Sequence, residues 1–122
     1  MENKKLMAPF LNKEIDGIRL EEDGLYLTFK NSKMKIYDDG QSCCEWRYMR
    51  TDDDLPYYVG ATFHGVEIKN APDMEDEYEV HEVQFLEIIT SKGSFTISTH
   101  NEHNGYYGGF WIKVKIEEQK GA

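Results

Sequence analysis

The sequence is poor in several residue types, and each shortage excludes a class of protein. Only two cysteines occur, Cys43 and Cys44, and because they are neighbours they cannot cross-link distant segments into a secreted disulfide framework. Three prolines and no Gly/Ser-rich stretch leave no linker, so we expect a single domain over residues 1–122 with an ordered core of about 11–117. The first ten residues contain no apolar run long enough for a signal peptide or a membrane span, which predicts a soluble, cytoplasmic protein.

Basic residues are also scarce. Fourteen Lys and Arg stand against twenty-three Asp and Glu, which gives a formal net charge of -9. Because binding to nucleic acid depends largely on cations that neutralise phosphates, direct binding of DNA or RNA is disfavoured. An acidic protein can instead act as a mimic of nucleic acid, since its carboxylates can occupy a basic groove of a protein partner.

What the sequence does contain is alternation of apolar and polar residues with a period of two, interrupted by clusters of Gly, Asn, Asp and Ser. This pattern is typical of short antiparallel strands. The expected strands are 15–20, 25–29, 34–36, 43–49, 63–68, 80–90, 95–99 and 110–116. We therefore predict an all-β or mainly-β domain, an antiparallel β-sandwich or open barrel of about eight short strands.

Particular segments lead to more specific expectations. The strands at 95–99 and 110–116 are predicted to form a hairpin. The segment 80–90 carries apolar residues on both faces near its end, which predicts burial on both sides. Residues 70–79 are rich in acidic side chains and are expected to be a solvated loop. A short helix within 54–61 has only a weak signal.

No residue pattern indicates catalysis or a cofactor. The sequence lacks a Gly-x-Ser-x-Gly motif, a P-loop and a dinucleotide fingerprint. His100 and His103 flank Glu102 without a recognised metal-ligand spacing, and adjacent cysteines on a strand point to opposite faces, so both thiolates seldom reach one ion. We predict a protein that is not an enzyme and binds no metal or cofactor. Which of the two cysteines is exposed stays open.

The segment 101–110 is the best candidate for a contact surface, because it combines two adjacent tyrosines with three glycines and several amides. Tyrosine rings can stack on a base, and arginine guanidinium groups can hold a phosphate in a bidentate manner. The alternatives are a plain hairpin loop and arginines paired with surface carboxylates. The candidate ligand-binding residues are Arg47, Arg50, His103, Asn104, Tyr106 and Tyr107.

Four short motifs give the chain a family resemblance. They are an early Ile-x-x-Ile strand, Asp-Gly-Gln-Ser-Cys-Cys-Glu at 39–45, Val-Gly-Ala at 59–61 and Asn-Gly-Tyr-Tyr at 104–107. With them, residues of about 11–116 resemble an uncharacterised domain family seen in phage, prophage and Firmicute proteins. In size and β-rich character the chain is also similar to phage sponge proteins that sequester the cyclic ADP-ribose-type signals of Thoeris defence. The resemblance implies a counter-defence role in the host cytoplasm.

Two functional hypotheses follow. In the first, the protein is a non-catalytic, homo-oligomeric binding protein that sequesters a small nucleotide signalling molecule: Tyr106 and Tyr107 stack on the base, Asn104 reads its edge, and Arg47 or Arg50 holds phosphate. In the second, the acidic clusters at 52–54 and 73–82 dock into a basic protein partner, such as a CRISPR nuclease, as a mimic of nucleic acid. The glycine-tyrosine segment favours the first hypothesis and the net charge favours the second.

Overall fold

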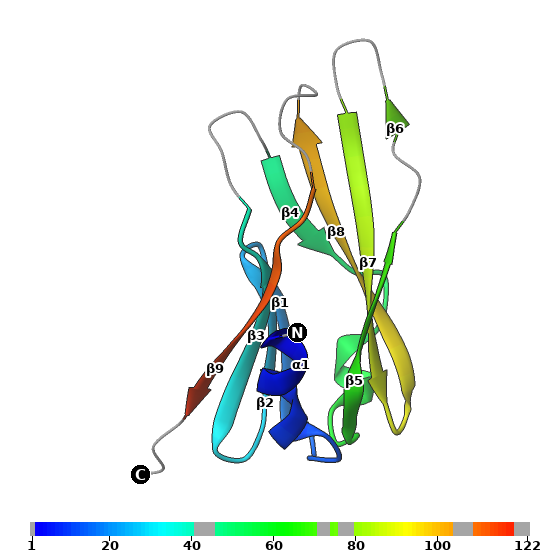
Figure 1. The fold of residues 1–122 in the computed structure, drawn as a ribbon. Coiled ribbons are helices and arrows are strands. Elements are labelled where there is room, and N and C mark those ends of the chain that lie inside the picture. Colours follow the sequence, from blue (N-terminus) through cyan, green and yellow to red (C-terminus); the bar gives the residue numbers. More distant parts are fainter. Residues whose placement is uncertain (1, 41–45, 71–73, 76–79, 104–108, 119–122) are drawn as a thin grey trace.

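Two antiparallel β-sheets stack face to face around an apolar core in the computed structural model of the chain (Figure 1). The structure describes all residues except 1, 41–45, 71–73, 76–79, 104–108 and 119–122. The first sheet has the order β1-β2-β3-β9, with the bounds Gly17–Glu21, Gly24–Thr28, Ser32–Asp38 and Ile112–Glu118. The second has the order β4-β8-β7-β5, with the bounds Trp46–Arg50, Gly93–His103, Val80–Thr90 and Phe63–Asn70. The predicted antiparallel sandwich is confirmed, and the two sheets do not close into a barrel within the described residues.

Three short helical segments accompany the sheets in the described part of the chain. The weak helix signal within 54–61 corresponds to a single 3-10 turn, η2, over Leu55–Tyr58. Helix α1, Glu2–Met7, is not predicted by the sequence pattern and runs into the 3-10 turn η1, Ala8–Phe10. Helix α1 lies between β9 and β5 (Figure 1), and the Asn3 side-chain amide donates a hydrogen bond to the Ile112 carbonyl at 2.7 Å. Met7 is buried in the core, so residues ahead of position 11 also contribute to it.

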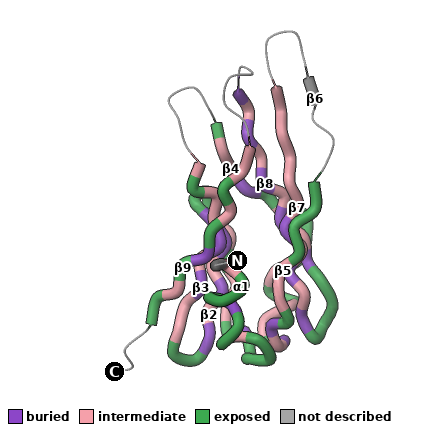
Figure 2. The backbone as a smooth tube through the Cα atoms, viewed as in Figure 1, coloured by how far each residue is buried: buried purple, intermediate pink, exposed green. Residues whose placement is uncertain are grey.

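The longest hairpin, β7-β8, shows the alternation predicted from the sequence. Thr90 pairs with Gly93 across a tight turn, where Gly93 adopts a φ of +109°, a conformation that favours glycine. Along β8 every second side chain from Phe95 to His103 is buried (Figure 2). Near the end of β7, Leu86 and Ile88 are buried on the inner face, whereas the apolar residues of the outer face are only half-buried.

The expected pairing of 95–99 with 110–116 is wrong. Strand β8 lies between β4 and β7 in the second sheet, and β9 crosses to the first sheet, where it pairs with β3 and aligns Val114 with Ile36. Both strands alternate as predicted, but alternation specifies which face is buried and not which strand is the neighbour. Strand β9 finds its partner in β3 because Val114 and its inward-facing neighbours complete the same core.

The acidic segment 70–79 and the cysteine pair lie partly or wholly outside the described residues. Within the expected acidic loop at 70–79, Met74–Glu75 forms the two-residue strand β6, which pairs with the beginning of β7. Residues 71–73 and 76–79 lie outside the described residues, and so do Cys43 and Cys44.

The core fills the space between the sheets toward the β7-β8 turn. Its fully buried large side chains come from both sheets and from the segment before β1. They are Ile15, Leu25, Leu27, Met34, Ile36, Phe63, Leu86, Ile88, Phe95 and Ile97. At the other end of the sandwich, the upper end in Figure 1, the inward-facing residues change from apolar to polar.

Candidate functional site

A group of polar side chains fills the space between the sheets at this end, and we call it the polar interior. On β8 the buried positions after Phe95 and Ile97 are polar, and the register places polar residues of β4 and β7 beside them. Asp38 joins from the end of β3 in the facing sheet, through a bond to Arg47. The members of the polar interior are Asp38, Arg47, Glu82, Gln84, Thr99, Asn101 and His103.

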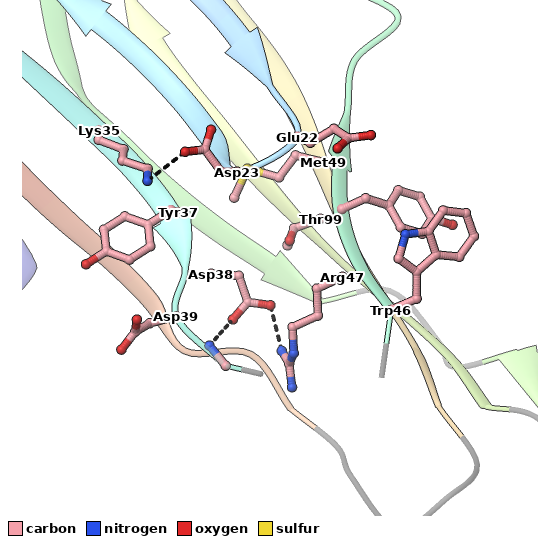
Figure 3. A pocket seen from close by; sticks show the side chains of 12 residues that line it. Glu22, Asp23, Lys35, Tyr37, Asp38, Asp39, Trp46, Arg47, Met49 and Thr99 are labelled. Atoms are coloured by element: carbon pink, nitrogen blue, oxygen red, sulfur yellow. Dashed lines mark hydrogen bonds and ion pairs between the residues drawn. The ribbon is translucent and has the colours of Figure 1, made fainter. Parts of the chain in front are cut away.

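One part of the polar interior is a buried ion pair that ties the two sheets together (Figure 3). An Arg47 guanidinium nitrogen lies 2.6 Å from an Asp38 carboxylate oxygen, and both side chains are at most 9% exposed. The second Asp38 oxygen accepts hydrogen bonds from the backbone N–H groups of Gly40 and Trp111, each at 3.0 Å. Arg47 also donates to the Gly109 carbonyl at 2.9 Å. The guanidinium is therefore held in place by the fold.

A second part joins β7 to β8. The His103 ring nitrogen Nε2 lies 2.7 Å from a Glu82 carboxylate oxygen, and the Gly109 backbone N–H donates to the same oxygen at 2.9 Å. His103 is buried and Glu82 is half-buried. The pair orients the imidazole ring at the inner face of the sheet.

Between these two pairs lie buried polar atoms that have no hydrogen-bond partner among the described residues. They are the Thr99 hydroxyl, both the oxygen and the nitrogen of the Asn101 amide, and the Gln84 side-chain oxygen. Thr99 is 1% exposed and Asn101 is 0% exposed. Each buried donor or acceptor that stays unpaired costs about 1–3 kcal/mol, so folded proteins rarely keep several of them together. Such a group is explained by ordered water or by a ligand that supplies the missing bonds.

A cavity of about 410 Å³ opens between the end of β3 and the edge strand β4 (Figure 3). Thr99 and Met49 contribute to its wall, and Arg47, which pairs with Asn101 across the β4-β8 ladder, lies at its side. Other lining residues supply rings, cations and carboxylates. They are Glu22, Asp23, Lys35, Tyr37, Asp38, Asp39, Gly40, Trp46 and Tyr48. The volume falls within the range of small-molecule sites.

Two of the four carboxylates around the cavity are bound to cations of the same wall. Asp23 lies 3.0 Å from the Lys35 ammonium, and its pKa is lowered by the hydrogen bond from Tyr26 and by the bond to Lys35. Asp38 holds Arg47, and Asp39 lies 3.6 Å from the ammonium of Lys113 outside the cavity. The wall is thus polar, and its two cations, Lys35 and Arg47, are both held by carboxylates.

Residues 8–112 match a protein family described as a domain of unknown function, DUF7448. The chain belongs to this family. No curated protein and no solved structure matches the chain. Every member of the polar interior in this DUF7448 protein falls within the matched range, so the site is part of the family domain.

The structure brings together some of the residues predicted to bind a ligand and separates others. Arg47 and His103 both belong to the polar interior. Arg50 is on the opposite face of β4, where its guanidinium carbon lies 5.0 Å from the centre of the Tyr48 ring. Arg47 and Arg50 therefore cannot grip one ligand together. Asn104, Tyr106 and Tyr107 lie outside the described residues.

The outer face of the second sheet carries a separate cluster of rings. Tyr48 stacks on His100 with ring centres 4.7 Å apart, and His100 is hydrogen-bonded to His81 at 2.9 Å. Burial lowers the pKa of His100, and the nearby charges of His81 and Arg50 lower it further. Burial also raises the pKa of Tyr48, whose hydroxyl donates to Glu102 at 2.8 Å. Because the rings face one another, this cluster stabilises the sheet and offers little stacking surface.

Sequence reasoning missed Thr99, Asn101, Gln84 and Asp38 as site residues. The signal was present in the alternation itself: from Phe95 onward, positions of the same parity must face the core, and Thr99 and Asn101 continue that series. A polar residue at an inward-facing position is the more informative observation, because buried polar groups need a partner.

Two further findings concern metals and membranes. Among the described residues, no group of three or more His, Cys, Asp or Glu side chains is placed to hold a metal ion. Over the same part of the chain, no helix has the length and apolar character needed to cross a bilayer.

Proposed function

We propose that this protein is a non-catalytic binding protein that captures a small nucleotide-like molecule in the polar interior. The observation that carries the proposal is that Thr99 and Asn101, on the inner face of β8, keep buried polar atoms without a partner among the described residues, and that Thr99 also lines a cavity of about 410 Å³. Unpaired buried polar atoms lower the stability of the folded protein. A ligand that forms hydrogen bonds with them removes this penalty, which strengthens its binding.

The chemistry of the wall favours a heterocyclic base over other polar ligands. An asparagine side chain offers one donor and one acceptor side by side, which is the pattern needed to pair with the edge of a base such as adenine. Tyr37 is an aromatic residue of the cavity wall, whereas the Trp46 ring packs against Tyr48 on the outer face of β4, with ring centres 4.6 Å apart. Lys35 and Arg47 are the cations nearest to any phosphate that the ligand carries, although both already hold a carboxylate.

The setting of the proposal comes from the resemblance to phage proteins. A counter-defence protein that sequesters a signalling molecule must bind it tightly and be present in enough copies. It needs no covalent step. A cyclic ADP-ribose-like signal combines adenine with ribose and phosphate, which suits the amide, hydroxyl and ring groups of the wall. The predicted homo-oligomer is tested by sedimentation analysis with and without ligand.

The test is isothermal calorimetry with adenosine, AMP, ADP-ribose and a cyclic ADP-ribose isomer. We expect one of these ligands to bind with a Kd in the micromolar range or below, and T99V and N101L to weaken it at least tenfold. T96V is the matched control, because Thr96 lies on the same strand but faces the other side. Absence of heat with all four ligands, or equal affinity in N101L, would overturn the proposal.

The structure gives the nucleic-acid-mimic hypothesis less support. Asp52, Asp53 and Asp54 are exposed, but one Asp53 oxygen accepts the backbone N–H of Thr96 at 2.7 Å, so this carboxylate also has a structural role. The other acidic cluster lies mostly outside the described residues. A pull-down at low salt with D52N and D54N tests the hypothesis, which predicts loss of a basic protein partner.

A further inference from the structure

A second cavity, independent of the polar interior, lies at the opposite edge of the sandwich. Its volume is about 470 Å³, and its lining residues come from α1, β3, β5 and β9. We call it the apolar groove. It is lined by Asn3, Lys4, Leu6, Met7, Ile36, Val66, Ile68, Ile112, Lys113 and Val114.

The lining is aliphatic and reaches from the surface to the core. Ile36 and Val114, at 1% and 8% exposure, belong to the core cluster. Leu6 and Ile68 are exposed at 37% and 49%, although both are large apolar residues. No aromatic ring occurs among the described lining residues, so these offer no surface for stacking a planar ligand. A flexible hydrocarbon chain fits such a slot, since its contacts are non-directional and grow with the apolar area removed from water.

The charged side chains that line the groove among the described residues are of one sign. They are Lys4 and Lys113, in a chain whose net charge is -9. The other cavity, by contrast, is lined by four carboxylates. Lys113 lies 3.6 Å from Asp39, but both side chains are more than half exposed, so this ion pair is weak and can be exchanged for another anion. The groove therefore combines an apolar interior with a cationic rim.

We propose that the apolar groove binds a single-chain aliphatic carboxylate, with the hydrocarbon chain between β5 and β9 and the acid group at Lys4 and Lys113. Charge complementarity selects an anionic head, and the aliphatic lining selects the chain. A second copy of the protein fits less well, because two grooves brought face to face would place their lysines against each other.

The first test is a chain-length series of octanoate, decanoate and dodecanoate, each below its micelle-forming concentration, measured by calorimetry. Burying one CH2 group contributes ~0.8 kcal/mol, so affinity is expected to rise about fourfold per added carbon until the groove is full. Dodecyltrimethylammonium, which has the same chain and a cationic head, is expected to bind at least tenfold more weakly than dodecanoate.

Variants separate the contribution of the chain from that of the head. L6Q and I68Q change exposed groove residues and are expected to lower dodecanoate affinity at least tenfold, with folding intact by circular dichroism. L11Q is the matched control, since Leu11 is an equally exposed leucine that does not line the groove. K4Q together with K113Q is expected to remove the preference for the anionic head and to keep the dependence on chain length.

The proposal is wrong if dodecanoate does not bind, if affinity is independent of chain length, or if L11Q weakens binding as much as L6Q. It is also wrong if sedimentation shows a dimer that I68Q dissociates, because the groove would then be covered by a second copy. None of these outcomes bears on the polar interior, whose ligands are tested separately.

Discussion

Replacing Thr99 with valine is expected to make the protein more stable, which is unusual for a buried polar residue. Thr99 is 1% exposed, and its hydroxyl has no partner within the described structure. Valine has nearly the same shape and removes the cost of burying an unpaired hydroxyl, about 1–3 kcal/mol. We expect T99V to raise the free energy of unfolding by about 1–2 kcal/mol in the absence of ligand, and Tm by about 4 °C per kcal/mol.

Thr90 provides the matched control, since it is also a buried threonine on the inner face of the second sheet. Its hydroxyl donates to the Gly93 carbonyl at 2.6 Å and accepts the Lys92 N–H at 3.1 Å. T90V is therefore expected to lower the free energy of unfolding by about 1–2 kcal/mol. Urea titrations of the wild type and both variants measure the difference. If T99V is destabilised like T90V, the Thr99 hydroxyl already has a hydrogen-bond partner, for instance a buried water molecule. That result would refute the argument that a ligand supplies its missing bond.

Two further predictions concern charge. Because burial lowers the pKa of His100 in the folded state, the unfolded chain binds the proton more readily, so stability is expected to fall as pH drops from 7 to 5. Urea titrations at pH 5, 6 and 7 should show that the free energy of unfolding falls less steeply with decreasing pH in H100Q than in the wild type. H64Q, a change at an exposed histidine, is the control and should behave like the wild type. Equal slopes for H100Q and the wild type would contradict this prediction. D38N removes the charge that Arg47 needs in the buried ion pair and is expected to lower the free energy of unfolding by about 3–5 kcal/mol. D39N changes an exposed ion pair and is expected to lower it by less than about 1 kcal/mol. Similar unfolding free energies for D38N and D39N would show that the buried pair does not hold the sheets together.

Much of the fold could be predicted from the sequence, because alternation is a local signal. The inward positions of β8 and β9 follow directly from the spacing of Phe95, Ile97, Ile112 and Val114. The partner of β9 could not be predicted in this way, since β3 is distant in the sequence and several strands offer the same pattern. Helix α1 was missed because it is only six residues long and buries little besides Met7.

The candidate site was harder to predict than the fold. Sequence reasoning selected residues by type, so it chose the arginines and the tyrosines and passed over Thr99 and Asn101. Their importance comes from burial without a partner, which depends on the pairing of β8 with β4 and β7 and on the facing sheet. Asp38 became visible only through its bond to Arg47, which joins strands of different sheets.

The central claim is that a small molecule occupies the polar interior and completes the bonds of Thr99 and Asn101. Native mass spectrometry tests it most directly, with wild type and N101L purified from the same infected or signal-producing cells. We predict that the wild type carries a nucleotide-like adduct of defined mass and that N101L, although folded, does not. A wild type without any adduct, or the same adduct on both proteins, would contradict the account.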